Sequence, residues 1–250
     1  MRPKIEVRQL AKGFASADGA LRVVDGVDFS VADGEFVAIV GPSGCGKSTL
    51  MNVLAGFLRP DQGAVLVDGV EVSGPSASRI LISQGGSVFP WLTVHENLTF
   101  GLRERPNVDQ TELAFHYASL VGLLGFEHRY PHQLSGGMVR RVELARALVV
   151  QPDILFMDEP FSGLDALLSL RMRNEVLRIL GGERHTILLI THDVEEAIHM
   201  ADRILVLSPR PTKVQASFDV PLAHPRRLTS PEVQELRVRI LAELGVDRSD

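Results

Sequence analysis

The residues with the clearest capacity for chemistry lie in a glycine-rich segment that directly follows an apolar run, Phe36–Val40. The segment has the form G-x-x-x-x-G-K-[ST], a spacing that lets a tight loop aim successive backbone N–H groups at a phosphate. The helix that follows adds partial positive charge, the lysine reaches the β- and γ-phosphates, and the serine hydroxyl binds Mg²⁺. A plain strand–turn–helix junction is the alternative. The pattern predicts a nucleoside triphosphate site composed of Gly41, Pro42, Ser43, Gly44, Cys45, Gly46, Lys47, Ser48 and Thr49.

Two adjacent carboxylates, Asp158 and Glu159, follow a second apolar run at residues 154–157. An unpaired carboxylate at the end of a buried strand is costly, so a bound cation is the simplest explanation for this pair. Because a phosphate loop is present in the same chain, that cation would be Mg²⁺. We expect Asp158 to bind the metal, directly or through water, and Glu159 to polarise the attacking water.

Three single residues each have a structural and a functional interpretation. His192 follows the apolar run Thr186–Ile190, so it is either structural or a contact for the γ-phosphate at the edge where α/β sheets bind ligands. Gln84 ends a short apolar run beside two glycines, and it is either a loop residue or a Mg²⁺ ligand together with Ser48 and Asp158. Phe14 precedes a small, polar loop, and it is either a core or edge-strand aromatic or a stacking surface for adenine.

A second pair of glycines opens a helix later in the chain. Ser135, Gly136, Gly137 and Met138 begin a segment whose apolar residues repeat at helical spacing. Ser135 either simply caps this helix or, with the accessible N–H groups of the two glycines, forms a second phosphate grip. Because the chain's own glycine-rich loop already surrounds the phosphates, a second grip makes most sense against a nucleotide bound by another subunit. Asp165 is expected at a later turn and helix cap.

The elements that would position these residues form an α/β pattern, in which apolar strands alternate with helical segments. Alternating runs in residues 1–35 and a two-residue hairpin at Asp68-Gly69 predict an antiparallel sheet beside the nucleotide core. Between residues 93 and 150 the pattern becomes helical and starts with capping-box spacing. A last helix is expected from Ser230 to about residue 244.

The composition describes an ordinary globular protein. Its 250 residues, 45% hydrophobic and 23% charged, are enough for one or two domains. The net charge of −5 argues against a nucleic-acid partner, because such proteins usually carry a basic excess. Cys45 is the only cysteine, so no intramolecular disulfide can form. No signal peptide and no apolar run of about 18 residues is visible, so we expect a cytosolic chain or one held at a membrane through a partner.

Taken together, these residues resemble the ATP-binding subunit of an ABC transporter over about residues 3–210. Five motifs stand in that family's order: the Walker A loop at 41–49, the Q-loop at Gln84, the signature at 134–138, the Walker B pair Asp158-Glu159 and the switch histidine His192. The resemblance implies a P-loop NTPase core with a mainly parallel sheet, an N-terminal antiparallel β-subdomain and a helical signature subdomain. A single domain would then span 1–210, with the helical part inserted at about 93–150 and a tail with a short helix at 211–250.

The resemblance also implies how the subunit works. Two copies would close head to tail over two ATP molecules and Mg²⁺, each nucleotide lying between one copy's Walker A loop and the other copy's signature residues. Asp165 would reach across that interface, and Phe14 would stack on adenine. Hydrolysis would reopen the dimer, and the region from Gln84 to about residue 100 would pass the motion to a membrane-spanning permease.

Within the family, the chain resembles the importers of nitrate, sulfonates and taurine at residues 89–94, at Met138 and at residues 225–232. Such importers use a separate substrate-binding protein, and their ATPase subunit sits at the cytoplasmic face of the membrane on the permease. Phe89, Trp91 and Leu92 are either core residues or an exposed docking patch. Two local departures from the family pattern are Gly85-Gly86 after the Q-loop glutamine and Val139-Arg140-Arg141 after the signature.

Two other functions are compatible with the cassette itself. One is a soluble ABC ATPase of repair or translation, without a permease, but such proteins usually carry two cassettes or long insertions. The other is the ATPase subunit of an exporter or of a lipid or metal transporter. This chain has one cassette, no heptads and a net negative charge, which argues against the soluble ATPase; the gene neighbourhood or a co-purifying permease would separate an importer from an exporter.

Overall fold

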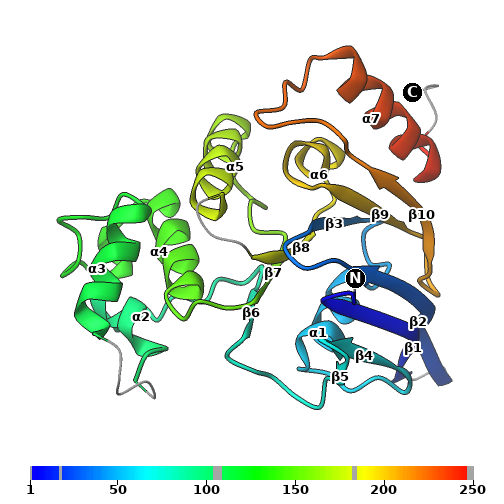
Figure 1. The fold of residues 1–250 in the computed structure, drawn as a ribbon, viewed down its shortest axis with the longest axis horizontal. Coiled ribbons are helices and arrows are strands. Elements are labelled where there is room, and N and C mark those ends of the chain that lie inside the picture. The colour runs from blue at the N-terminus through cyan, green and yellow to red at the C-terminus, as the bar shows by residue number, and fades with distance from the viewer. Residues whose placement is uncertain (1, 17–18, 104–108, 182–184, 247–250) are drawn as a thin grey trace. The chain divides into compact units, whose positions relative to one another are not determined.

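The computed structural model describes residues 2–16, 19–103, 109–181 and 185–246. The chain divides into two compact units (Figure 1). The first unit contains Met1–Ser76, Phe156–Glu159 and His185–Asp250, and the second contains Ala77–Leu155 and Pro160–Arg184.

The first unit begins with an antiparallel sheet in the order β2-β1-β4-β5, built from Ile5–Ser16 (β1), Gly19–Val31 (β2), Gln62–Val67 (β4) and Val70–Glu71 (β5). The expected hairpin is present, since Val67 pairs with Val70 across Asp68 and Gly69. Both turn residues have positive φ, 52° and 82°, as a two-residue hairpin turn requires.

The second sheet of this unit surrounds the most apolar strand of the chain, Phe36–Val40 (β3), all of whose residues are buried. Strand β3 runs parallel to both of its neighbours, Thr186–Ile190 (β8) and Arg203–Leu207 (β9). Strand Ile154–Asp158 (β7) follows β8 in the sheet order and is also fully buried. Strands that are buried on both faces read as continuous apolar runs, which is how the sequence identified them.

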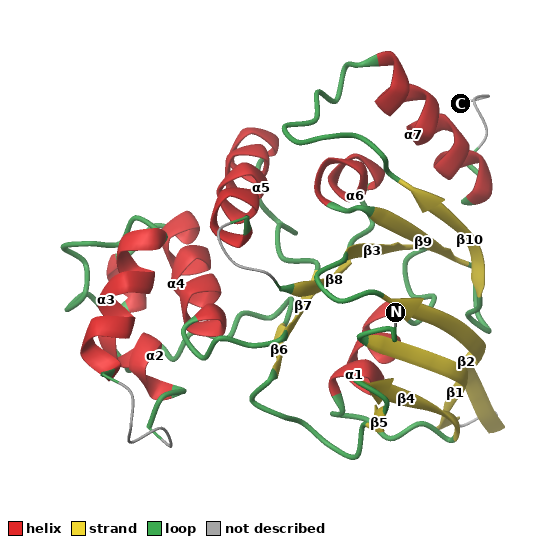
Figure 2. Cartoon of the chain, viewed as in Figure 1, coloured by secondary structure: helices red, strands yellow, loops and turns green. Residues whose placement is uncertain are grey.

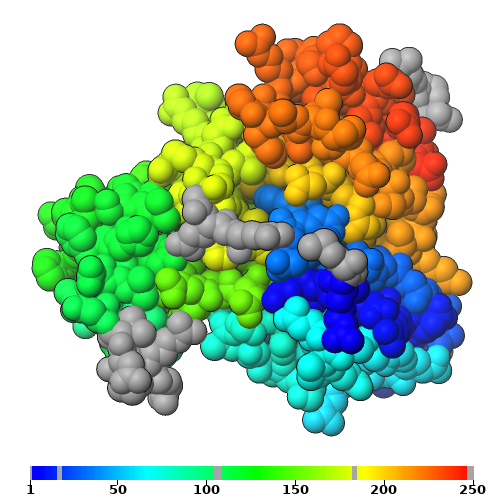
Figure 3. Space-filling view, in the orientation of Figure 1, coloured from blue at the N-terminus to red at the C-terminus, as the bar shows by residue number. Residues whose placement is uncertain are grey.

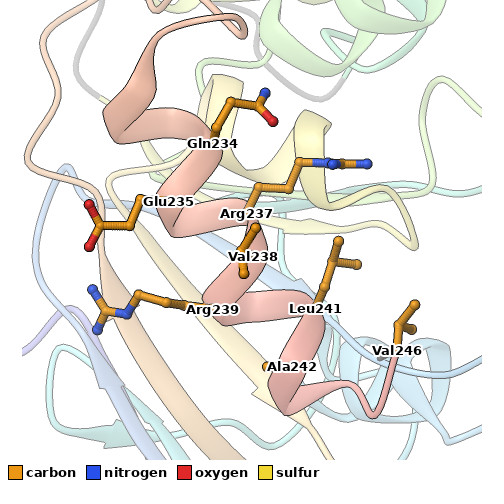
Figure 4. Close-up of a pocket in the computed structure, with 8 residues that line it drawn as sticks. All are labelled: Gln234, Glu235, Arg237, Val238, Arg239, Leu241, Ala242 and Val246. Carbon is orange, nitrogen blue, oxygen red and sulfur yellow. The ribbon is translucent and has the colours of Figure 1, made fainter. Parts of the chain in front are cut away.

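Among its described residues, the first unit also contains the helices Lys47–Ala55 (α1), Val194–Met200 (α6) and Pro231–Glu243 (α7) (Figure 2). Helix α7 packs against α6 and is exposed in orange and red in the space-filling view (Figure 3). Its inner face is buried through Val233, Leu236 and Ile240. The outer face bears a shallow groove in which Val238, Leu241 and Val246 are apolar (Figure 4).

The second unit is mainly helical. Helix Val94–Phe100 (α2) contacts both Gln110–Leu120 (α3) and Gly136–Leu148 (α4), and α3 also contacts α4 (green in Figure 1). The unit also contains strand Arg79–Ile82 (β6), a short 3-10 helix at Pro131–Gln133 and helix Ala166–Leu180 (α5). The capping box predicted at Thr93 is confirmed, since its side chain accepts from Glu96 N–H and the Glu96 carboxylate accepts from Thr93 N–H.

The predicted α/β class, with a mainly parallel sheet and an antiparallel β-subdomain, is confirmed. The expected domain division, with a helical part inserted at about 93–150 and a tail at 211–250, stays a prediction. The second unit starts at Ala77 and includes Pro160–Arg184, while the tail contributes a strand, Val214–Asp219 (β10), to the edge of the parallel sheet. Strand β10 pairs antiparallel with β9, so the tail is part of the core unit rather than an appendage. No helix within the described residues is long and apolar enough to cross a membrane.

Candidate functional site

The glycine-rich loop joins the buried end of β3 to the start of α1, and close packing requires two of its glycines, Gly41 and Gly46. Gly46 has a φ of 122°, and a Cβ at this position would lie 2.5 Å from Val23 Cγ1. A Cβ on Gly41 would lie 3.1 Å from Leu207 Cβ. The Thr212 hydroxyl donates to the Cys45 carbonyl, and this hydrogen bond adds a third contact that holds the loop. The loop is therefore held against β2 and the end of β9 in a shape that side chains would disturb.

Lys47 is placed inside this loop rather than in solvent. Its side chain is only 6% exposed, and Nζ donates to the carbonyl oxygens of Gly41 (2.8 Å) and Pro42 (3.0 Å). Within the described residues, α1 has no side-chain cap at its N-terminus and no acidic residue in its first turn. The ammonium group and the start of the helix thus concentrate positive charge at the loop, as an anion site requires.

Asp158 ends β7, and the Ser48 hydroxyl lies near enough to its carboxylate to lower the pKa of that group, so the structure brings together two of the three predicted metal ligands. The residue is 7% exposed, and burial raises the pKa of its carboxyl group above 3.8. Oδ1 of Asp158 has no hydrogen-bond partner among the described residues. A buried carboxylate oxygen without a donor, beside a serine hydroxyl, fits a hard divalent cation such as Mg²⁺.

Glu159 follows in an unusual backbone conformation. Its φ is 47°, in the left-handed region that non-glycine residues rarely adopt, and its N–H donates to the Ile190 carbonyl at 2.9 Å. The side chain meets the predicted switch histidine, since Nδ1 of His192 lies 3.2 Å from Oε2 of Glu159. Strained backbone of this kind is concentrated at functional sites, where the surrounding structure enforces it.

Phe14 is not a core residue. It lies on β1 opposite Leu21, is 41% exposed, and contributes to an open pocket on the β1–β2 hairpin. Nζ of Lys12 lies 5.6 Å from the centre of its ring, and Lys12 is held by Asp61 at 2.6 Å. An exposed ring is compatible with stacking on a base, and this role stays a prediction.

The remaining predicted residues belong to the second unit. Ser135 caps α4 by accepting from Met138 N–H at 3.3 Å, and Asp165 caps α5 by accepting from Leu168 N–H at 2.9 Å. Both cap residues are exposed, as is Gly136. The capping roles are thus present, and action on a nucleotide held by another copy stays a prediction. Gln84 lies just after β6 in the same unit, and its metal role also stays a prediction.

Three side chains from neighbouring helices contact the loop after Gln84, and the sequence did not indicate their importance. Asn97 is fully buried and accepts from Phe89 N–H while donating to the Phe89 and Leu92 carbonyls. Glu143 and Arg146, on α4, contact the same loop. Trp91 is 69% exposed, so of the two alternatives for this residue the core position is wrong.

Comparison with known proteins agrees with the geometry. The family model described as ABC transporter matches residues 24–162. The taurine import ATP-binding protein TauB of Pelagibacter ubique is 45% identical over 79% of this chain and 75% of its own length. The aliphatic sulfonates import ATP-binding protein SsuB of Bacillus thuringiensis is 35% identical over 96% of this chain and 95% of its own length.

A solved structure of a bacterial ABC transporter cassette, MJ0796, is also similar. That structure, described as dimeric, matches with a TM-score of 0.76 and 25% identity, covering 88% of this chain and all of the other. The family match, the two relatives and the shared fold agree with the phosphate loop and the carboxylates found here. The chain belongs to the ABC transporter family, as one of its ATP-binding subunits that hydrolyse ATP.

Proposed function

We propose that this chain energises an ABC importer of a small solute of the sulfonate or taurine class, with nitrate as a further member of the group. The observation that carries this proposal is the similarity to TauB and SsuB, which extends along the cassette. Both of these relatives are named as import ATP-binding proteins. The transported solute would be selected by a permease and a separate binding protein, to which this chain supplies ATP hydrolysis.

In the proposed binding step, the loop amides and the start of α1 hold the triphosphate. Lys47 exchanges its bonds to the Gly41 and Pro42 carbonyls for bonds to phosphate oxygens, so its charge is already placed before ATP arrives. Ser48 and Asp158 hold Mg²⁺, with Gln84 as a further ligand, and the bound metal neutralises charge that develops on the phosphates. Phe14 stacks on the adenine ring.

In the proposed chemical step, Glu159 accepts a proton from the water that attacks the γ-phosphate. His192, 3.2 Å from the Glu159 carboxylate, orients that carboxylate and contacts the γ-phosphate. The bond between Glu159 N–H and the Ile190 carbonyl holds the strained backbone in place, which limits where the carboxylate can lie.

The proposed assembly is a head-to-tail pair of copies. Ser135, Gly136, Gly137 and Met138 of one copy contact the nucleotide in the loop of the other, and Asp165 reaches across the interface. An exposed serine cap followed by an exposed glycine leaves amide groups accessible for this purpose. The pair would sit on permease subunits at the cytoplasmic face of the membrane.

Uptake by cells tests this function. Cells that lack the chromosomal copy would express either the wild-type chain or Glu159→Gln, and accumulation of labelled taurine, an alkanesulfonate and nitrate would be measured. We expect uptake of at least one of these solutes to depend on the wild-type chain and to be lost in the variant. Equal uptake with both chains, for all three solutes, would overturn the proposal.

A further inference from the structure

The loop that follows Gln84 is attached to the signature helix by side chains from that helix. We infer that Glu143 and Arg146 are positioning residues that make the 84–92 loop and the Ser135 end of α4 move as one body. This inference rests on the proposed function, because it concerns how the nucleotide contact at Ser135 is connected to a surface where a permease would dock. All of these residues lie in the second unit.

Glu143 makes the first attachment. Its carboxylate is 3% exposed, and each oxygen has a donor: Ser87 N–H bonds to Oε1 at 2.7 Å, and Arg140 bonds to Oε2 at 2.5 Å. A buried carboxylate is stable only when it is paired in this way, so releasing Ser87 would leave part of a buried charge without a donor. The loop cannot leave α4 at this point without that cost.

Gly86 is what allows Glu143 to approach so closely. Its φ is +78°, and a Cβ there would lie 3.0 Å from Oε1 of Glu143. One residue from each of the two departures from the family pattern, Gly86 after Gln84 and Arg140 in the signature helix, therefore meets the Glu143 carboxylate. A small residue at position 86 and a cation at position 140 thus serve the same buried carboxylate.

Arg146 makes the second attachment, one turn further along α4. Its guanidinium lies 3.9 Å from the centre of the Phe89 ring and 5.8 Å from that of Phe100. The Phe89 ring in turn stacks on Trp91 at 5.4 Å, and Trp91 is the exposed end of this series. A guanidinium held against an aromatic ring is attracted to it, so this contact resists separation.

Both attachments lie in the second half of α4, and Ser135 caps the start of the same helix. Glu143 lies eight residues after Ser135, a distance of about 12 Å along an α-helix. A force applied to Phe89 and Trp91 is therefore transferred through Glu143 and Arg146 to the helix whose first residues meet the nucleotide. In the reverse direction, capture of ATP at Ser135 would displace Trp91.

Trp91 is the only tryptophan of the chain, so its fluorescence reports on the loop without a label. The experiment adds ATP to the chain carrying Glu159→Gln, which slows hydrolysis, and measures both Trp91 emission and dimer formation by sedimentation. We expect the emission change to follow dimer formation with the same dependence on ATP. Adding Glu143→Ala should leave ATP-driven dimers but reduce the emission change at least about fivefold, the lower end of ordinary coupling between sites.

Several variants separate positioning from simple folding. Glu143→Gln retains an acceptor for Ser87 and should keep most of the emission change, whereas Gly86→Ala should reduce it by pushing the loop away from Oε1 without altering α4. Glu175→Ala removes an exposed ion pair with Arg178 in the same unit and serves as the matched control, with the emission change intact.

The outcomes distinguish a failure of this inference from a failure of the proposed assembly. A dimer that forms without an emission change, or an emission change of full size in both Glu143→Ala and Gly86→Ala, would overturn the inference while leaving the proposed function intact. Failure of the Glu159→Gln chain to form an ATP-driven dimer would overturn the proposed assembly and this inference together.

Discussion

Replacing Gly46 by alanine should damage the phosphate loop for a reason that can be calculated from its surroundings. The new Cβ would lie 2.5 Å from Val23 Cγ1, far inside ordinary van der Waals contact, and would adopt a φ of 122°. The unfavourable backbone conformation costs about 1–3 kcal/mol. Overpacking against Val23 costs a further 1–3 kcal/mol, roughly. The expected loss of about 2–6 kcal/mol is a large part of the total stability of a typical domain.

Gly44 provides a matched control in the same loop. It also has a positive φ, 71°, but the nearest described atom to an added Cβ is Arg210 Nη2 at 3.6 Å, an ordinary contact. Gly44→Ala should therefore show only the backbone cost, about 1–2 kcal/mol for a single left-handed residue. Gly46→Ala should therefore be the more destabilised variant, through its steric contact and its less favourable φ together.

A double-mutant cycle isolates the contact with Val23. Val23→Ala removes the methyl group that the new Cβ would strike, so Gly46→Ala should be less harmful in that background by about 1–3 kcal/mol. Val23→Ala should give no such relief to Gly44→Ala. Stability would be measured by urea unfolding followed by circular dichroism. ATP affinity would be measured with a fluorescent nucleotide. We expect the affinity of Gly46→Ala to fall at least about tenfold, which corresponds to a loss of about 1.4 kcal/mol in binding free energy.

Two results would refute this reasoning. If Gly46→Ala and Gly44→Ala were equally stable, the close contact with Val23 would make no difference to the free energy of unfolding. If Val23→Ala did not relieve Gly46→Ala, the damage would have another origin. Either result would mean that the loop is not held against β2 as the packing at Gly46 indicates.

Three further predictions concern the chemistry. Glu159→Gln should lower turnover by roughly 10²–10⁴-fold while ATP still binds, and unchanged turnover would reject Glu159 as the group that accepts the proton. Ser135→Arg should block ATP-driven dimerisation in sedimentation experiments, and normal dimers would remove the role proposed for the signature. Burial raises the pKa of Asp158, so the folded state binds this proton more tightly than the unfolded state does. Without nucleotide and metal, the charged carboxylate therefore destabilises the fold at neutral pH, and this effect disappears as the pH falls through the raised pKa. Asp158→Asn should be more stable than the wild-type chain to urea at pH 7 and show a smaller difference near pH 4; a less stable variant at pH 7 would contradict this.

The parts of the site that the sequence predicted are those determined by neighbouring residues. The loop from Gly41 to Thr49, the cap at Ser135 and the carboxylates at the end of β7 all depend on short spacings and on apolar runs that can only be buried strands. Strand β10 was missed for the converse reason. Its residues alternate between half-buried and exposed at the edge of the sheet, so no continuous apolar run marks it.

The contact between Glu143 and Ser87 could not be predicted, because nothing in either local sequence refers to the other. The two residues are 56 positions apart, and Glu143 occupies a place in α4 where a charged side chain would ordinarily be expected to face water. Its burial makes sense only once the 84–92 loop is present to supply the Ser87 N–H and Gly86 has no side chain to obstruct it. The burial of Glu143 in α4 thus depends on the backbone conformation at Gly86 and Ser87. For that reason Gly86→Ala and Glu143→Ala should act through the same contact, and the second change should add little to the first in the Trp91 experiment.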